Sequence, residues 1–415
     1  MSQIIATAVA VDNLPHLHNI AGSDGMLFVH GDEGIASTGQ FTRVGPSQVH
    51  AFLSEIQHHY TDEHDKDGPI ALGFLPFLRE EREDLFVPHI FARRFSDGYT
   101  SITVLTDAEM SEKERLVHVD EVVTSLLRSL PPVFQQKNIE RHLSNTPLTP
   151  ITTYLAAVSE ARSAVRSGQI EKAVIARDIE LKSDTPLNIH SVLTYLHEQY
   201  STCYQFSIDH LVGASPELLV HMEKGIVHSN PLAGTTPRTG DPATDAQNAA
   251  DLLASKKNQI EHRVVVEMVH DTLLQWCSYL DWEPEPSVVS VANVQHLGTH
   301  VTGPLSDTNT HVLEIARELS PTPALGGFPR TEAIELINRV EHMNRGRYGG
   351  AVGWCDAQGN GTWAVTIRCA QFSTDLMSAR LFAGGGIVAD SEPELELAET
   401  ESKFKAMTNA IMHSS

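Results

Sequence analysis

The chain has 415 residues, a formal net charge of −23 at pH 7, and 41% apolar residues. This length allows two or three domains or one large domain, and the acidity disfavours phosphate backbones and anionic membranes, because like charges repel. We therefore expect no nucleic-acid or membrane partner, and an anionic substrate would require particular cationic residues or a metal in its site.

The four cysteines are widely spaced and form no CxxC pair, so neither a disulfide framework nor a zinc knuckle is expected. The N-terminus has no basic stretch before its short apolar run, which indicates a first strand rather than a signal peptide. No segment approaches transmembrane length. We expect a cytoplasmic protein with reduced, buried thiols and, since no apolar surface helix stands out, a monomer.

The first third of the chain, residues 1–145, contains no set of residues arranged for catalysis. The polar stretch 135–150 spans the end of this part and finishes in proline, which is typical of a boundary. We predict a β-rich N-terminal part at 1–145 and a compact catalytic region at 146–415. The predicted elements of the first part are strands at 25–31 and 99–106 and helices at 45–59 and 111–130.

The second part begins with an amphipathic helix at 151–168 that ends in glycine, a common helix C-cap, and a strand at 172–181. Two groups of consecutive strands joined by short turns follow, at 204–234 and 349–386. Short turns between consecutive strands indicate antiparallel pairing. The pattern predicts an α+β fold of two packed, mainly antiparallel sheets flanked by helices.

Two long helical stretches belong to this second part. The first runs from Pro242 to Leu280 with a predicted break near Ser255. The last helix of the chain is predicted to begin at Ser391, with Glu394 three residues later completing a capping box. Both stretches carry acidic residues, which makes them candidates for a functional site.

Two ionisable residues lie next to apolar strand sequence. Lys172 shares a strand face with Val174 and Ala176, so it is either an edge lysine that extends to water or a buried amine kept uncharged, able to act as a base. Glu217 follows a Gly-Ala-Ser-Pro corner and precedes apolar residues. It is either a strand-edge acid or a carboxyl group that burial keeps protonated, able to donate a proton.

Acidic residues on two helices suggest a metal. Glu261 shares a helical stripe with Val265, Met268 and Thr272, a mainly apolar face on which an unpaired carboxylate is costly. A bound cation is one way to offset that cost. Mg2+ needs few protein oxygens, so carboxylates from two different helices would suffice to bind it.

The second helix offers its partner. Glu396, Glu399 and Lys403 fall at i, i+3 and i+7 and share one stripe. Taken alone, this stripe is typical of a solvated face. Taken with Glu261, it predicts a magnesium site formed by Glu261 and Glu399.

Further features concern anion binding and excluded cofactors. Arg368 lies in a predicted strand, where its planar fork needs a partner and suits a carboxylate. The glycines at 384–386 either direct backbone N–H groups at an anion or form a tight loop. No GxGxxG motif is present, and the 22 histidines show no zinc-site spacing along the sequence, so neither a dinucleotide nor a zinc hydrolase is expected.

Read in order, eight blocks of sequence resemble the motifs of chorismate-utilising enzymes, and most closely those of isochorismate synthase. The resemblance covers residues 150–412, and the N-terminal third looks like the divergent β-rich part of that family. The blocks are KAVIAR, GASPELLV, PLAGTTPR, EHRVVVEMV, VQHLGTHVTG, SPTPALGGFP, GGAVGWCDAQGNGTWAVTIRCA and LFAGGGIVADSEPELELAETESK.

The resemblance implies roles for individual residues. Lys172 stands at the position of the base that activates water, whereas ammonia-adding relatives carry another residue there. Glu217 matches the general acid that protonates the departing 4-hydroxyl group. Glu261 and Glu399 match the Mg2+ ligands, with Glu396 as a water-bridged ligand. The implied substrate contacts are Arg368, Lys403 and the amides around Gly384 for carboxylates, and Gly234, Thr235 and His296 as pocket-lining positions.

The resemblance also leaves alternatives open. Salicylate synthases form isochorismate and then eliminate pyruvate, but Ala324 and Leu325 resemble the isochorismate synthase version of their motif. Ser320 stands where relatives usually have histidine, so a silent chorismate-binding protein is a third hypothesis. The sequence does not distinguish a siderophore pathway from a menaquinone pathway.

Overall fold

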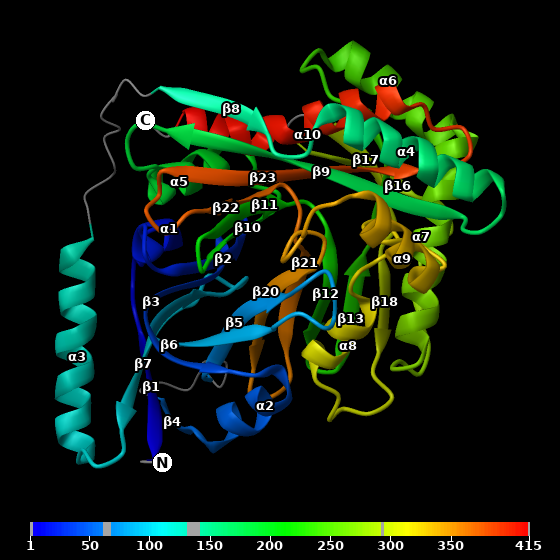
Figure 1. Cartoon of the computed structure of the whole chain (residues 1–415). Coiled ribbons are helices and arrows are strands. Elements are labelled where there is room, and N and C mark those ends of the chain that lie inside the picture. Colours follow the sequence, from blue (N-terminus) through cyan, green and yellow to red (C-terminus); the bar gives the residue numbers. More distant parts are fainter. Residues whose placement is uncertain (1–2, 61–67, 131–141, 292–293, 414–415) are drawn as a thin grey trace.

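A computed structural model describes residues 3–60, 68–130, 142–291 and 294–413 (Figure 1). Its helices are α1 (Leu17–Ala21), α2 (Pro46–Glu55), α3 (Glu112–Ser129), α4 (Ile151–Arg166), α5 (Ile189–Gln199), α6 (Pro242–Ala254), α7 (Lys256–Leu274), α8 (Val312–Leu319), α9 (Arg330–Val340) and α10 (Pro393–Met412). No helix among the described residues is long and apolar enough to cross a membrane.

The strands of the first part are β1 (Ile4–Ala10), β2 (Met26–His30), β3 (Glu33–Val44), β4 (Gln57–Tyr60), β5 (Ile70–Leu75), β6 (Asp84–Arg94), β7 (Thr100–Asp107) and β8 (Leu143–Pro147). Those of the second part are β9 (Lys172–Ser183), β10 (Tyr204–Ile208), β11 (Leu211–Ser215), β12 (Leu218–Glu223), β13 (Ile226–Asn230), β14 (Leu232–Pro237), β15 (Asp281–Trp282), β16 (Ser287–Ser290), β17 (Val294–Gly298), β18 (Val301–Pro304), β19 (Gly327–Phe328), β20 (Ala351–Asp356), β21 (Gly361–Val365), β22 (Cys369–Phe372) and β23 (Ser378–Ile387).

Most of these strands belong to one hydrogen-bonded sheet that bends into two layers. One layer runs β8–β9–β23–β22–β11–β10, and β2, β3 and β6 connect it to the other, which runs β5–β20–β21–β12–β13–β18. Among the described ladders only β1–β4 is parallel. The predicted α+β fold with mainly antiparallel sheets is confirmed.

The first and second parts of the chain share this sheet, because β2 pairs with β10 and β5 pairs with β20. Part of the predicted boundary, residues 135–141, lies outside the described residues, and its remainder contains β8, which pairs with β9.

The core lies between the two layers and beneath the helices. Phe74, Phe206 and Trp363 belong to one buried apolar cluster that joins strands of both layers. A second cluster, which includes Tyr154 and Ile387, lies where α4 and α9 pack on β9 and β23. Figure 1 shows α10 and α4 along β9 and β23, so this helix layer covers the strand that begins with Lys172.

Most predicted helices and the helix break are confirmed. α6 and α7 meet at Ser255, whose side chain caps α7 by accepting from the backbone N–H of Asn258. α7 ends at Leu274 rather than Leu280. The predicted capping box at Ser391 is wrong, because α10 begins two residues later and the Ser391 hydroxyl instead accepts from the Val388 N–H.

One strand prediction also needs correction, because Arg368 does not lie in a strand. Its φ of 50° separates β21 from β22 within the predicted strand group 349–386. The glycines at 384–386 lie within β23, paired in register with β9, so the strand prediction is confirmed there and the tight-loop alternative is wrong. All four cysteines are free and buried, as expected.

Candidate active site

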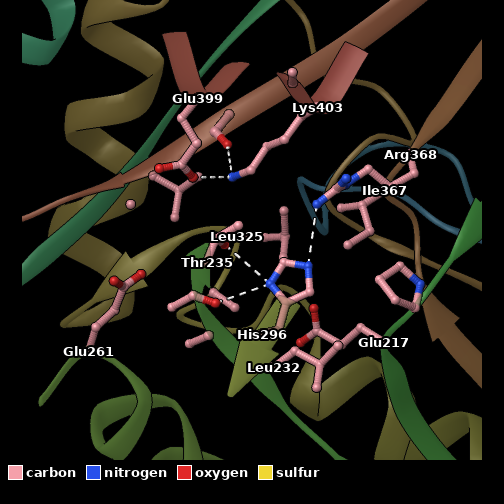
Figure 2. Close-up of a pocket in the computed structure, with 18 of the residues that line it drawn as sticks. Glu217, Leu232, Thr235, Glu261, His296, Leu325, Ile367, Arg368, Glu399 and Lys403 are labelled. Carbon is pink, nitrogen blue, oxygen red and sulfur yellow. Dashed lines mark hydrogen bonds and ion pairs between the residues drawn. The ribbon is translucent and has the colours of Figure 1, made fainter. Parts of the chain in front are cut away.

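Every residue predicted for the site lines one cavity of about 240 Å³, the scale of a small-molecule site (Figure 2). The cavity is formed by the start of β9, the end of β23, the β11–β12 corner, β14, β17, α7 and α10. The predicted residues on its wall are Lys172, Glu217, Gly234, Thr235, Glu261, His296, Ala324, Leu325, Arg368, Gly384, Glu396, Glu399 and Lys403.

One wall of the cavity contains a largely buried ion pair. The Lys172 side chain is 3% exposed, and its Nζ donates to Glu261 Oε1 at 2.8 Å. Lys172 is therefore a buried residue and not an edge lysine that extends to water. Glu261 lies on the cavity face of α7, whose neighbouring stripe position Val265 is fully buried, so packing of this helix directs the carboxylate inward.

Another wall contains a buried carboxyl group without a close cation. Glu217 is 3% exposed, and its Oε1 has no hydrogen-bond partner among the described residues. Burial raises the pKa of Glu217 to about 8, and the backbone of Leu232 and the charges of Lys172 and Arg368 offset this only in part. The group is thus protonated at neutral pH, as the second interpretation of the sequence predicts.

Figure 2 shows Glu217 beside His296, with Glu261 well apart from both. His296 Nδ1 lies 3.1 Å from the Gly234 carbonyl, and its Nε2 lies 3.4 Å from Arg368 Nη2. A carbonyl only accepts and a guanidinium only donates, so Nδ1 carries the proton and Nε2 accepts. Burial, followed by Arg368 and Lys403, lowers the pKa of His296 to about 3, which fixes a neutral ring.

Arg368 is buried and has no carboxylate within ion-pair distance among the described residues. A buried guanidinium without an anionic partner is costly, and its fork matches a carboxylate. Its cavity position therefore fits an anionic ligand. The left-handed backbone at this residue interrupts the strand and brings the side chain into the cavity wall.

The stripe on α10 forms a further wall. Lys403 Nζ donates to Glu399 Oε1 at 2.6 Å and to the Gly384 carbonyl at 2.6 Å. Burial favours a higher pKa for Glu399, but Lys403, His296 and Lys257 together outweigh it and the net shift is downward. Burial and then the charge of Glu399 raise the pKa of Glu396. The stripe therefore lines the cavity and is not a solvated helix face.

Glycines of β23 give these carboxylates room. A Cβ added to Gly385 would lie 2.7 Å from Glu396 Oε2, and a Cβ added to Gly386 would lie 2.7 Å from Glu261 Oε1. Gly384 directs its carbonyl away from β9 to Lys403, and the N–H of a strand residue points to the same side as its carbonyl. The Gly384 amide therefore also faces away from β9.

Glu261, Glu396 and Glu399 do not converge on one point, since the only tight group of potential ligands among the described residues lies elsewhere. Two of these carboxylates instead form ion pairs with lysines, Glu261 with Lys172 and Glu399 with Lys403. The cavity therefore contains paired carboxylates and ammonium groups and no preformed metal site.

Sequence reasoning missed several residues of the wall. Lys257 lies one helical turn before Glu261 on α7. Its charge offsets part of the upward shift in the pKa of Glu396 and contributes to the downward shift in that of Glu399. That i, i+4 spacing was a usable signal. No pattern pointed to Tyr348, which stacks on Phe382 with ring centroids 5.2 Å apart. The other missed lining residues are Val174, Pro216, Leu232, Ala233, Asn258, Ile367, Ala383 and Gly386.

The segment that contains Ala324 and Leu325 contributes apolar wall. Leu325 is buried, and its carbonyl accepts from Arg345, which also donates to the Val174 carbonyl and thereby ties this segment to β9. Ser320 is buried but is not among the described residues that line the cavity, and its hydroxyl has no partner among them.

Comparison with known proteins identifies the family. The sequence profile described as "Chorismate binding enzyme" matches residues 34–412. The chain belongs to the chorismate-binding enzyme family. This confirms the family that the sequence blocks resemble, and the chain is accordingly an enzyme.

Individual relatives agree. Isochorismate synthase DhbC of Bacillus subtilis is 38% identical over 296 residues, covering 68% of this chain and 74% of the relative. Isochorismate synthase MenF of the same organism is 33% identical over 379 residues, covering 88% and 80%. The structure of MenF from Escherichia coli, a menaquinone-specific isochorismate synthase, superposes with a TM-score of 0.83 at 25% identity, covering 99% of this chain and 95% of that one.

Proposed function

We propose that this enzyme is an isochorismate synthase that converts chorismate reversibly to isochorismate with Mg2+. Water adds at carbon 2 of the ring, the double bonds shift, and the 4-hydroxyl leaves as water, so the atoms balance. The observation that carries this proposal is one cavity with a buried lysine on one wall and a buried, protonated glutamic acid on another.

Glu217 is the proposed general acid. It must carry a proton at neutral pH, and burial raises its pKa to about 8. A protonated carboxyl group can donate to the departing 4-hydroxyl, which leaves poorly as hydroxide. Its Oε1, which has no partner among the described residues, is available for that hydrogen bond.

Lys172 is the proposed base, and its pairing with Glu261 bears on how it works. Its Nζ donates to Glu261 Oε1 at 2.8 Å, so Glu261 positions the amine on the cavity wall. A bound Mg2+ would engage the charge of Glu261, which would leave the Lys172 amine available to take a proton from water.

The residues present fit Mg2+. Glu261, Glu396 and Glu399 supply the oxygen ligands that this ion prefers, and Mg2+ completes its shell with water and substrate oxygens. The spaces at Gly385 and Gly386, which a Cβ would fill, leave room beside two of these carboxylates. When bound, Mg2+ would neutralise the ring carboxylate of chorismate and help orient it.

Cationic groups of the chain are proposed to hold the substrate carboxylates. Chorismate is a dianion, and the protein is strongly acidic, so recognition needs local positive charge. Arg368, which lacks a carboxylate partner among the described residues, offers a bidentate site. Lys403 and the Gly384 amide offer further donors, while Gly234 and Thr235 orient the His296 ring beside Arg368.

The direct test is chromatography of chorismate incubated with the protein and Mg2+. We expect isochorismate to form, approach equilibrium with chorismate, and cease forming when EDTA removes the metal. Lack of turnover, or turnover unaffected by EDTA, would contradict the proposal. Salicylate fluorescence and pyruvate release in the same reaction would identify a salicylate synthase, and calorimetric binding of chorismate without product would identify a silent binding protein.

The named relatives serve both siderophore and menaquinone synthesis: the E. coli structure is of a menaquinone-specific enzyme, and a Vibrio cholerae relative is vibriobactin-specific. Isochorismate is the product in either case. We therefore propose the reaction without assigning its pathway.

A further inference from the structure

A second group of metal-binding side chains lies outside the catalytic cavity. One ligand atom from each of His16, Asp32 and His197 lies within 4.8 Å of the other two. Among the described residues this is the only set of three or more histidine, cysteine, aspartate or glutamate side chains that meets that limit. None of the three belongs to the cavity wall.

These residues come from distant parts of the sequence. His16 is the residue before α1, Asp32 lies in the turn between β2 and β3, and His197 lies near the end of α5. The backbone around them is fixed by packing, since Leu17 of α1 and Leu196 of α5 belong to one buried apolar cluster. A spacing rule applied to the sequence could not find this group, because folding alone brings it together.

The side chains are suited to metal binding. His16 and Asp32 are exposed, while His197 is half-buried and fixed between His16 and His18, with ring centroids 5.4 and 4.6 Å away. Imidazole and carboxylate groups are ligands that divalent transition metals accept in proteins.

A second observation points to a ligand. Nδ1 of His197 is inaccessible to solvent and has no hydrogen-bond partner among the described residues. A buried ring nitrogen without a partner is costly, and a metal bond made by that nitrogen would offset the cost. His18 is not a member of this group, and its Nε2 lies 2.7 Å from Gln205 Oε1.

We propose that His16, Asp32 and His197 bind a divalent transition-metal ion, with Zn2+ as the best-suited ion and water in the fourth position. Two imidazoles and one carboxylate match the ligands of zinc sites that keep an open position. Mg2+ prefers an all-oxygen set and discriminates against this group. The site is therefore chemically distinct from the proposed catalytic metal site.

The geometry requires a modest adjustment. Zinc–ligand bonds of about 2.0–2.2 Å in a tetrahedron place neighbouring ligand atoms about 3.4 Å apart, closer than the 4.8 Å limit that the three atoms meet here. His16 and Asp32 are exposed and free to rotate by that amount, while α5 holds His197. The bound ion would join α1 and the β2–β3 turn of the first part of the chain to α5 of the second.

The test is Zn2+ binding by the full-length protein, measured by calorimetry in excess Mg2+. His16→Ala and Asp32→Asn change exposed side chains of the site, and His142→Ala removes an exposed histidine elsewhere. We expect one Zn2+ per chain for the wild type and for His142→Ala. Since losing even an outer partner of a ligand weakens metal sites about tenfold or more, both site variants should bind at least about tenfold more weakly.

Two further readouts distinguish this site from the active site. Co2+ in place of Zn2+ should give the visible absorption of a four-coordinate site in the wild type, and that band should be absent in His16→Ala. Chorismate turnover with Mg2+ should be unchanged in His16→Ala, so the outcome does not depend on the proposed function. Absence of stoichiometric Zn2+ binding, or equal binding by the wild type and both site variants, would overturn the inference.

Discussion

Two carboxyl groups share the catalytic cavity and differ in their neighbours. Glu261 contacts the Lys172 ammonium at 2.8 Å, whereas Glu217 has no cation within ion-pair distance among the described residues. Both are largely removed from bulk water, yet an ion pair favours the charged carboxylate and burial alone favours the neutral acid. The proposed roles, metal ligand for Glu261 and proton donor for Glu217, depend on this difference in partner.

The largest predicted effect comes from removing Lys172, the cation that pairs with Glu261 and not with Glu217. Lys172→Ala should lower turnover of chorismate by roughly 10³- to 10⁴-fold, because a positioned base contributes up to about that factor. Mg2+-dependent binding of chorismate, measured by calorimetry, should persist, because in the variant no lysine competes with the metal for the Glu261 carboxylate. The matched control is Lys182→Ala, which removes an exposed lysine from the same strand.

Retained turnover in Lys172→Ala would remove the lysine from its role. Loss of chorismate binding together with turnover would instead show that the Lys172–Glu261 pair shapes the cavity. Thermal unfolding of the variant distinguishes either outcome from a failure to fold.

Removing the acid from the other wall should have the next largest effect. Glu217→Gln preserves size and lacks the proton that the departing hydroxyl needs, so turnover should fall by roughly 10²- to 10³-fold. Wild-type turnover should also decline as pH rises through about 8, the pKa to which burial raises Glu217, because only the protonated form is the acid. Glu223→Gln, an exposed change on β12, serves as the control.

A wild-type rate that stays constant well above pH 8 would contradict this assignment. So would a Glu217→Gln variant with the turnover of the control. In either case the proton for the departing hydroxyl would have to come from another group on the cavity wall.

A smaller effect, on metal affinity, is predicted for Glu261. Glu261→Gln removes a charged oxygen ligand and should raise the Mg2+ concentration for half-maximal turnover by at least about tenfold. The control Glu267→Gln changes an acid of α7 that is not part of the described cavity wall. An unchanged Mg2+ requirement would show that Glu261 does not bind the metal. The different neighbours of Glu261 and Glu217 would then not correspond to different roles.

The residues of the cavity wall were predicted more completely than the bounds of the strands and helices. Lys172 and Glu217 were singled out because an ionisable residue beside apolar sequence is a candidate for burial, which costs free energy unless the group is paired or neutral. The resemblance to a known family then assigned both residues to one site. The structure confirms that the predicted residues lie together, while their roles stay predictions. The helix break near Ser255 was also predicted, and the structure shows the Ser255 side chain capping α7.

The features that could not be predicted depend on contacts between distant segments. Nothing local shows that Arg368 adopts a left-handed backbone and separates two strands, or that the Ser391 hydroxyl is used by the Val388 N–H. The cluster of His16, Asp32 and His197 is of the same kind, because a helix from the second part of the chain supplies one of its members.

The smallest predicted effect concerns stability, and its sign follows from Glu217. The carboxyl group has a pKa of about 8 in the folded chain and 4.5 as its ordinary value, so the folded state retains a proton that the unfolded state loses between these pH values. The free energy of unfolding therefore decreases as pH rises through this window. A glutamine side chain cannot ionise, so Glu217→Gln lacks this loss of stability. Between pH 5 and pH 8 the melting temperature of the variant should therefore rise by a few degrees relative to that of the wild type, and the difference should then level off. The measurement is a series of thermal melts without Mg2+ or substrate. Parallel melting curves across that range would mean that Glu217 is already ionised at pH 7, and its difference from Glu261 would disappear.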